Sequence, residues 1–184
     1  MVPESLRYPD PPLCDGRIGL RKWDEGDLDC VRLAGTDPAI PAGTTVPATY
    51  TAAEGLAFIQ RQWSRADRGE GLSLAIVDVS DDRAIGLVSI AMRPQQHVAG
   101  LGYWVVPSER GKGVATAAVR LVSPWALNAL GLQRLEAWTE PENLRSQAVL
   151  RSAGFEHEGR LRNFLRVDEH PVDAMVFAVL GSGV

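Results

Sequence analysis

One stretch of the chain, residues 100–130, combines a strand, a glycine-rich turn and a long helix. Residues 103–106 are aromatic or β-branched and run directly into Pro107, which predicts a buried strand that ends there. From Val114 onward, apolar side chains recur at the i, i+3, i+4, i+7 spacing of one helix face. The turn between strand and helix, residues 110–115, reads RGKGVA. This arrangement is the strongest constraint that the sequence places on the fold.

The glycine turn is typical of an anion-binding site. A helix leaves its first backbone N–H groups unpaired at the positive end of its dipole. Gly111 and Gly113 allow a phosphate to approach the backbone, and Arg110 and Lys112 add mobile positive charge. Because a strand precedes the turn and a helix follows it, we expect a pyrophosphate site. A solvated turn with a basic rim is the simpler alternative.

Three phosphate-binding devices use a turn of this kind. A P-loop requires Lys and Ser or Thr after its last glycine, but valine follows Gly113. A dinucleotide-binding fold requires a third glycine, where this chain has Thr116, and several strand-helix units in succession. Glu136 does stand where the ribose-binding acid of that fold would be. The third device, [RQ]-x-x-G-x-[GA], fits at every fixed position, with Arg110 first and Ala115 last.

That turn and three further stretches resemble the GNAT acyl-CoA N-acyltransferases. The likeness is greatest to the RimJ/RimL type, whose members include ribosomal-protein N-terminal acetyltransferases. The stretches are residues 17–29, 102–115, 134–155 and 159–180. The resemblance implies a single α/β (α+β) domain over residues 1–184, with a mixed, mostly antiparallel central sheet and helices on both faces. It also implies acetyl-CoA as the acyl donor and a primary amine, on a peptide, protein or small molecule, as the acceptor.

The resemblance assigns the coenzyme A site to two parts of the chain. The pyrophosphate is expected at the turn, and the rest of the coenzyme between the preceding strand and the start of a later helix. The implied coenzyme-binding residues are Tyr103, Trp104, Val105, Arg110, Gly111, Lys112, Gly113, Val114, Ala115, Asn143 and Ser146.

Asn143 and Ser146 lie three residues apart at the start of the later helix, on one helical face. The simpler interpretation is capping, because Asn is a favoured N-cap residue. The resemblance implies instead that Asn143 contacts the pantetheine arm and that Ser146 holds its hydroxyl near the coenzyme sulfur. Ser146 is therefore the predicted proton donor to the departing thiolate, and a backbone N–H at Val105 or a neighbour is the predicted oxyanion donor.

Two positions depart from the family pattern. Leu150 stands where many members carry a tyrosine as general acid, which favours Ser146 for that role. Gly100 stands where many carry a glutamate on the strand, so the usual base is missing, and Glu136 and His97 are the candidates to replace it. The departures leave open an alternative function, an acyl-CoA-binding regulatory module without catalysis.

The missing base bears on the choice of acceptor. A peptide α-amine, with a pKa near 7.7 to 8.0, is roughly 10 to 20% neutral at pH 7, whereas a lysine amine is below about 0.1% neutral. Because only the neutral amine attacks a thioester, the sequence favours an α-amine or a similarly weak base as the substrate.

Composition agrees with one soluble enzyme domain. The chain has 184 residues, of which 45% are hydrophobic, enough to bury a sizeable core. A formal net charge of -4 argues against nucleic acid or a membrane surface as a partner. Cys14 and Cys30 make no disulfide framework, and three scattered histidines make no metal set. No signal peptide or membrane span is evident, so we expect a cytoplasmic protein whose oligomeric state, a homodimer included, stays open.

The remaining patterns predict the other elements. Ser123-Pro124 predicts a kink or a new turn within the long helix. In chain order we expect a loosely held arm over residues 1–16, a strand over 18–22, a helix over 25–33 capped by Asp24, a loop over 35–49, a helix over 51–68 capped by Thr51, strands over 72–79, 84–92, 98–106 and 132–139, a helix from 143 to 153, and an antiparallel pair over 155–165 and 173–180.

Overall fold

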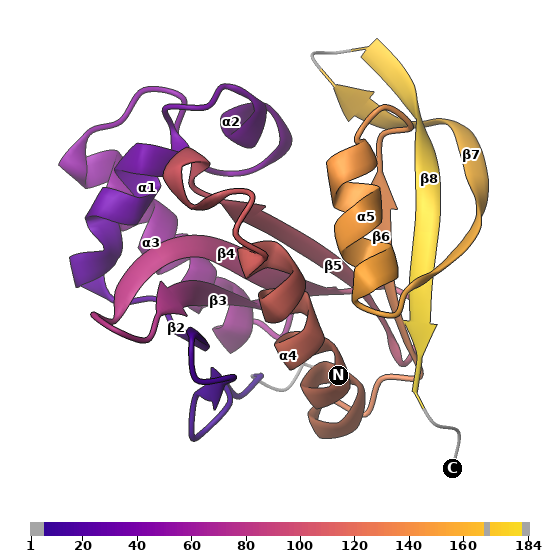
Figure 1. The fold of residues 1–184 in the computed structure, drawn as a ribbon, viewed down its shortest axis with the longest axis horizontal. Coiled ribbons are helices and arrows are strands. Elements are labelled where there is room, and N and C mark those ends of the chain that lie inside the picture. The colour runs from indigo at the N-terminus through magenta and orange to yellow at the C-terminus, as the bar shows by residue number, and fades with distance from the viewer. Residues whose placement is uncertain (1–5, 168–169, 182–184) are drawn as a thin grey trace.

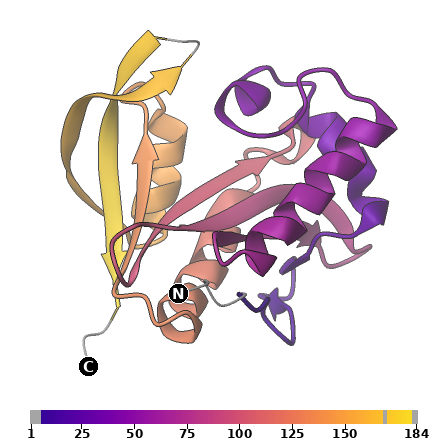
Figure 2. The same cartoon turned by 180° about the vertical axis from the view of Figure 1, so that it is seen from behind.

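The computed structural model describes residues 6–167 and 170–181 of the chain. These residues form one sheet in the strand order β1-β2-β3-β4-β5-β6-β8-β7, with helices on both faces (Figures 1 and 2). The fold class expected from the sequence is therefore confirmed. The helices and strands are, in chain order, β1 (Leu13–Cys14), β2 (Ile18–Lys22), α1 (Leu28–Ala34), α2 (Ala39–Gly43), α3 (Ala52–Asp67), β3 (Gly71–Asp78), β4 (Arg83–Met92), β5 (Val98–Val105), α4 (Val114–Ala129), β6 (Arg134–Thr139), α5 (Leu144–Ser152), β7 (Glu156–Val167) and β8 (His170–Leu180).

The first half of the sheet is an antiparallel meander of β2 to β5. β3 is buried along nearly its whole length because helices pack on both of its faces. On one face lie α1 and α3, and α3 begins at Thr51, whose side chain accepts a hydrogen bond from the Glu54 N–H at 3.1 Å (Figure 2). The predicted cap and the predicted β3–β4 hairpin are both confirmed.

The long helix α4 covers the opposite face (Figure 1). No new turn starts at Ser123, because α4 continues through Pro124 as a single helix. The Ser123 hydroxyl instead donates to the Val119 carbonyl oxygen at 2.7 Å. Apolar burial on both sides of Pro124 outweighs the loss of one backbone donor. The buried stripe of α4 consists of Val114, Ala118, Val119, Val122 and Ala126.

β5 and β6 are parallel, but they pair only over their first residues. Val98 faces Arg134, and the pairing ends where Gly100 faces Glu136. Beyond that point each strand keeps its other neighbour, β4 for β5 and β8 for β6. Figure 1 shows the two strands diverging from the base of the sheet, with α4 below and α5 beside the opening. The parted strands leave one side of the β5 backbone without a strand partner.

The expected loop over residues 35–49 contains a short helix, α2, which buries Ile40 in the core. A helix this short offers too few residues for an apolar period to be visible. The loop itself passes beside the turn that precedes α4, and its Asp37 reaches that turn.

Part of the expected N-terminal arm is joined to the domain. The Leu6 N–H donates to the Ala66 carbonyl oxygen at 2.9 Å, and β1 pairs antiparallel with β2. Residues 1–5 of the arm lie outside the described residues. A strand of two residues carries no alternation that a sequence pattern could reveal.

Candidate active site

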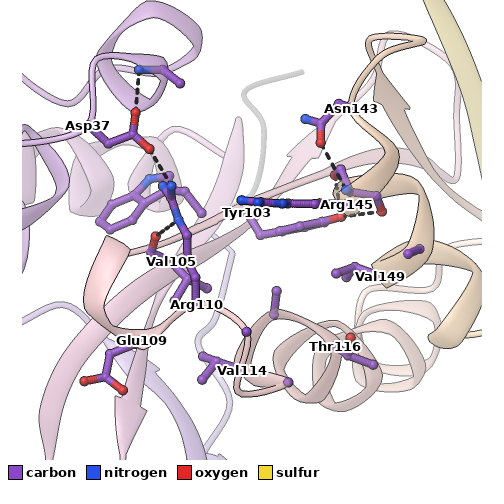
Figure 3. Close-up of a pocket in the computed structure, with 17 residues that line it drawn as sticks. Asp37, Tyr103, Val105, Glu109, Arg110, Val114, Thr116, Asn143, Arg145 and Val149 are labelled. Carbon is purple, nitrogen blue, oxygen red and sulfur yellow. Dashed lines mark hydrogen bonds and ion pairs between the residues drawn. The ribbon is translucent and has the colours of Figure 1, made fainter.

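A cavity of about 880 Å³ opens between the parted strands, the glycine turn and the start of α5 (Figure 3). Its floor is the beginning of α4, with Val114 and Thr116, and its far wall is the α5 face that carries Ser146 and Val149. Every residue predicted to bind coenzyme A lines this cavity except Lys112. Two distant parts of the sequence therefore meet at one site.

The glycine turn has the geometry that an anion site requires. Gly111 and Gly113 both lie at positive φ, 74° and 76°, a region that other residues adopt at a cost. Gly113 is the N-cap of α4, so the first N–H groups of the helix face the cavity end of the turn. Arg17, at the start of the sheet, donates from Nη1 to the Lys112 carbonyl oxygen at 2.9 Å and fixes the turn from behind.

The two cations of the turn are not mobile, which differs from the sequence-based expectation. Arg110 donates from Nε to the Val105 carbonyl oxygen at 3.0 Å and forms an ion pair with Asp37. Lys112, which does not line the cavity, pairs with Glu109, which does, at 2.9 Å. The Ala39 N–H and then Arg110 hold the pKa of Asp37 below its ordinary value. Charged partners from neighbouring segments thus neutralise both cations.

A pair of hydroxyl groups lies in the cavity wall. The Tyr103 hydroxyl oxygen is 2.6 Å from Ser146 Oγ, a contact in which either oxygen can donate, and 3.1 Å from the Ser146 carbonyl oxygen, which can accept the Tyr103 proton instead. Burial raises the pKa of Tyr103 to about 12, and the contact with Ser146 opposes that rise. Tyr103 therefore stays a neutral hydrogen-bond donor at physiological pH, and it ties β5 to α5 across the opening.

Asn143 caps α5, since its Oδ1 accepts the Ser146 N–H at 3.1 Å. The capping interpretation of these two residues is confirmed. Capping leaves the Ser146 side chain free to face the cavity, so it does not conflict with a chemical role for the hydroxyl. Arg145, between them, also lines the cavity (Figure 3) and has no ion-pair partner among residues 6–167 and 170–181.

The β5 backbone supplies hydrogen-bond donors to the opening. The Val106 N–H bonds to Ile85 on the β4 side. Because the two sides of a strand alternate from one residue to the next, the N–H groups of Val105 and Tyr103 point the other way, toward the gap left by β6. The bond from Arg110 to the Val105 carbonyl oxygen agrees with this direction. An oxygen in the gap would meet these donors.

The two candidate bases lie away from the cavity. His97 has a positive φ of 60°, and its Nδ1 contacts the Gly131 carbonyl oxygen at 2.8 Å, near the C-terminal end of α4. Glu136 lies beside Gly100 at the end of the β5–β6 pairing and forms ion pairs with Arg93 and Arg134 at 3.3 Å and 3.1 Å. The structure thus brings neither carboxylate nor imidazole to Ser146.

Sequence reasoning missed several residues of the lining. Thr116 and Val149 follow from helical spacing, three residues after Gly113 and Ser146. Asp37 and Arg145 had no such signal, because a lone acid in a loop and a basic residue in a helix are usually solvated.

A cavity that joins parted strands to an anion-binding turn, with a hydroxyl pair in its wall, defines a transferase that uses an acyl-coenzyme A. Residues 17–156 match the family model described as "Acetyltransferase (GNAT) domain". The chain belongs to the GNAT acetyltransferase family, and it is an N-acetyltransferase with acetyl-CoA as acyl donor.

Named relatives agree with this assignment. Probable N-acetyltransferase YjcK of Bacillus subtilis is 39% identical over 118 residues, which cover 63% of this chain and 65% of that protein. Uncharacterized N-acetyltransferase p20 of Bacillus licheniformis is 28% identical over 165 residues, or 89% of this chain and 93% of that protein. Among solved structures, Mycobacterium smegmatis RimJ in complex with CoA-disulfide has a TM-score of 0.79 at 28% identity, covering 92% of this chain and 85% of that one.

In the part of the chain that the structure describes, no helix is long and apolar enough to cross a membrane. Within the same residues, no three His, Cys, Asp or Glu side chains gather as metal ligands would.

Proposed function

We propose that this enzyme transfers the acetyl group of acetyl-CoA to an α-amino group, with Ser146 as the proton donor to the coenzyme sulfur and Tyr103 as the residue that positions it. The observation that carries the proposal is the contact of 2.6 Å between the two hydroxyl oxygens, in the wall of the cavity that leads to the glycine turn. The reducing cytoplasm is the proposed compartment, since Cys14 and Cys30 are both free thiols.

The coenzyme supplies an activated acetyl thioester, and the protein supplies position and charge compensation. The turn at Gly111 and Gly113 binds the pyrophosphate with backbone N–H groups, as an α-helix N-terminus does for anions. The thioester then lies between β5 and α5. There the N–H of Val105 or Tyr103 stabilises the oxyanion that forms as the amine attacks.

Proton movement follows from the direction of the hydroxyl contact. When the Tyr103 hydroxyl donates to Ser146 Oγ, the serine proton is free to point at the sulfur. Ser146 gives its proton to the departing thiolate and takes a proton from the nitrogen of the attacking amine, so the serine ends the reaction protonated. Tyr103 stays protonated throughout, because its pKa of about 12 lies far above neutral pH.

An α-amino acceptor is favoured by the absence of a base from the coenzyme cavity. The residues that line the cavity include Asp37 and Glu109, but each is held in an ion pair. An amine that is partly neutral at pH 7 needs no strong base to react, and peptide α-amines meet that condition. The resemblance to the RimJ/RimL type, whose members include ribosomal-protein N-terminal acetyltransferases, also supports acetylation of amino termini.

The test is thiol release from acetyl-CoA in the presence of a panel of peptides with free α-amines and matched peptides in which only a lysine side chain is free. We expect the α-amine peptides to react faster. Gly113→Glu should abolish turnover, because it places a carboxylate in the pyrophosphate site. Gly131→Glu is the matched control, since Gly131 also lies at positive φ, 62°, but at the far end of α4.

Three results would contradict the proposal. Faster reaction of the lysine peptides would overturn the α-amine preference. If Ser146→Ala leaves turnover unchanged, the serine hydroxyl is not the proton donor, and Ser146 serves only in the cap of α5. Tight binding of acetyl-CoA without turnover of any amine would favour the alternative, a regulatory module that binds the coenzyme.

A further inference from the structure

A second, smaller pocket, of about 440 Å³, lies on the sheet face turned away from α5. In β6 the buried residues Leu135 and Ala137 alternate with Arg134, Glu136 and Trp138, which therefore share the other face. Figure 2 shows that no helix covers this face over β6. The three side chains line the second pocket, and no assigned role accounts for it.

The pocket lies at the point where β5 and β6 part. Glu136 faces Gly100 in the last pair before the strands separate. Above Gly100 lies the Arg93 guanidinium, so close that a Cβ on residue 100 would be 2.5 Å from Arg93 Nη2. A few residues further along β5, Tyr103 enters the coenzyme cavity. A molecule in the second pocket therefore approaches the opening from the side opposite the coenzyme.

One wall of the pocket is aromatic. The Trp138 and Phe164 rings meet edge to face, with centroids 4.7 Å apart. Phe164 comes from β7, two strands away in the sheet, because the β7–β8 register shifts between Leu161 and Leu165. The Asn163 N–H, at a positive φ of 50°, donates to Asp173 at 2.8 Å and fixes this bulge.

A backbone irregularity thus holds Phe164 over the pocket although its side chain stays 46% exposed. An exposed aromatic group that is held in place on a pocket wall suits a large apolar group of a ligand.

Against the aromatic wall lies a guanidinium with an unused donor. Arg93 stacks on Trp138, with its central carbon 3.9 Å from the ring centroid. Its Nε is buried and has no hydrogen-bond acceptor among the residues that the structure describes. The nearest carboxylate oxygen, on Glu136, is 3.3 Å away, an ion-pair contact without hydrogen-bond geometry. A buried N–H that lacks an acceptor is costly, and a ligand oxygen would satisfy it.

We propose that this pocket binds the acceptor and selects an α-amino group flanked by a carbonyl or carboxylate oxygen and by a large apolar or aromatic side chain. Arg93 receives the oxygen, and Trp138 and Phe164 receive the side chain, so the neutral amine points toward the opening between β5 and β6. The proposal rests on acetyl transfer to an α-amine and names the substrate class for it. Lysine side chains and polyamines carry no oxygen beside the amine, so they leave Arg93 unsatisfied.

Three small amines test the selection in the thiol-release assay with acetyl-CoA. L-phenylalaninamide carries the amine, the carbonyl and the aromatic ring, whereas phenethylamine lacks the carbonyl and glycinamide lacks the ring. With rates compared per neutral amine, we expect kcat/KM for L-phenylalaninamide to exceed both others by about tenfold or more. Phe164→Ala should remove the advantage over glycinamide, and Arg93→Gln the advantage over phenethylamine.

Leu161→Ala is the matched control, because Leu161 is 41% exposed on the same strand and does not line the pocket. A second measurement is calorimetric titration of L-phenylalaninamide into the protein saturated with CoA. We expect binding that Phe164→Ala weakens about tenfold and Leu161→Ala leaves unchanged.

The two measurements separate this proposal from the proposed function. Binding that depends on Phe164, without turnover of any amine, would uphold the pocket and overturn acetyl transfer. Turnover of α-amines that neither Phe164→Ala nor Arg93→Gln alters would overturn the pocket and uphold the transfer. Absence of both binding and turnover with L-phenylalaninamide would also overturn the pocket.

Discussion

Tyr103→Phe is the change that most directly tests how the cavity handles protons. It removes one oxygen atom and keeps the aromatic ring, so the β5–α5 contact keeps its packing. The lost oxygen lies 2.6 Å from Ser146 Oγ and 3.1 Å from the Ser146 carbonyl oxygen. Without it, the serine hydroxyl has no partner to fix its direction.

The expected size of the effect follows from those contacts. Loss of a partly buried hydrogen bond lowers the free energy of unfolding by about 1 kcal/mol. A Ser146 hydroxyl that no longer points at the sulfur has a larger effect on the activation free energy of the reaction. If the unpaired hydroxyl loses about 1 to 3 kcal/mol of transition-state stabilisation, kcat falls roughly five- to 150-fold. The KM for acetyl-CoA should stay within about twofold of the wild-type value, because the pyrophosphate site is untouched.

The assay is steady-state thiol release with Tyr103→Phe, Ser146→Ala and the double variant. Residues that act as one unit are not additive, so the double variant should be no slower than Ser146→Ala alone. Tyr50→Phe is the matched control, because it removes a hydroxyl outside the cavity. A kcat for Tyr103→Phe within twofold of wild type, or full additivity in the double variant, would refute the reasoning.

Three further predictions follow from groups near the cavity. The pKa of Tyr103 is about 12 in the folded protein and near 10 when unfolded, so its stabilisation is complete below pH 10 and is lost between pH 10 and 12. Urea unfolding at pH 9 and pH 11.5 should therefore show wild type losing about 2 kcal/mol more than Tyr103→Phe, and equal losses would exclude this linkage. Arg17→Ala frees the Lys112 carbonyl oxygen, so calorimetry should show CoA binding about three- to tenfold weaker, and unchanged affinity would mean that the turn needs no support. Asp37→Asn releases Arg110 toward the phosphates, so CoA should bind roughly threefold more tightly at low salt and equally at high salt, whereas weaker binding would show that Asp37 serves to position Arg110.

The sequence predicted those helices and strands in which apolar residues recur at a regular spacing. The strand before the turn, the helix after it and the β3–β4 hairpin all follow from apolar spacing, and the cap at Thr51 follows from residue type. Asp24 also caps, but it caps a 3₁₀ helix over Glu25–Asp27, and the α-helix of the predicted segment begins only at Leu28. The anion site at the glycine turn was predictable from its own residues, whereas the resemblance to the GNAT acyltransferases was needed to place Asn143 and Ser146 beside it. Apolar spacing and helix caps depend on residues that are close along the chain, which is why a single sequence reveals them.

The parts that could not be predicted depend on contacts between distant segments. Nothing in the sequence pairs Tyr103 with Ser146, because that contact depends on how far β6 diverges from β5. Asp37, the ion-pair partner of Arg110, and Arg93, one of the two partners of Glu136, are equally remote along the chain, so the sequence indicated free charges where the structure has ion pairs.

The short pairing between β5 and β6 has a mechanical consequence. Among the residues that the structure describes, only the segment that ends at Gly100 and Glu136 joins the β1–β5 part of the sheet to the β6–β8 part by backbone hydrogen bonds between strands. Because this pairing is short, a rotation of one part of the sheet relative to the other, about the paired residues, would break few backbone hydrogen bonds. Amide hydrogen exchange reports this motion: the N–H groups of Tyr103 and Val105 should exchange rapidly in the free enzyme and slowly once the coenzyme bridges the opening.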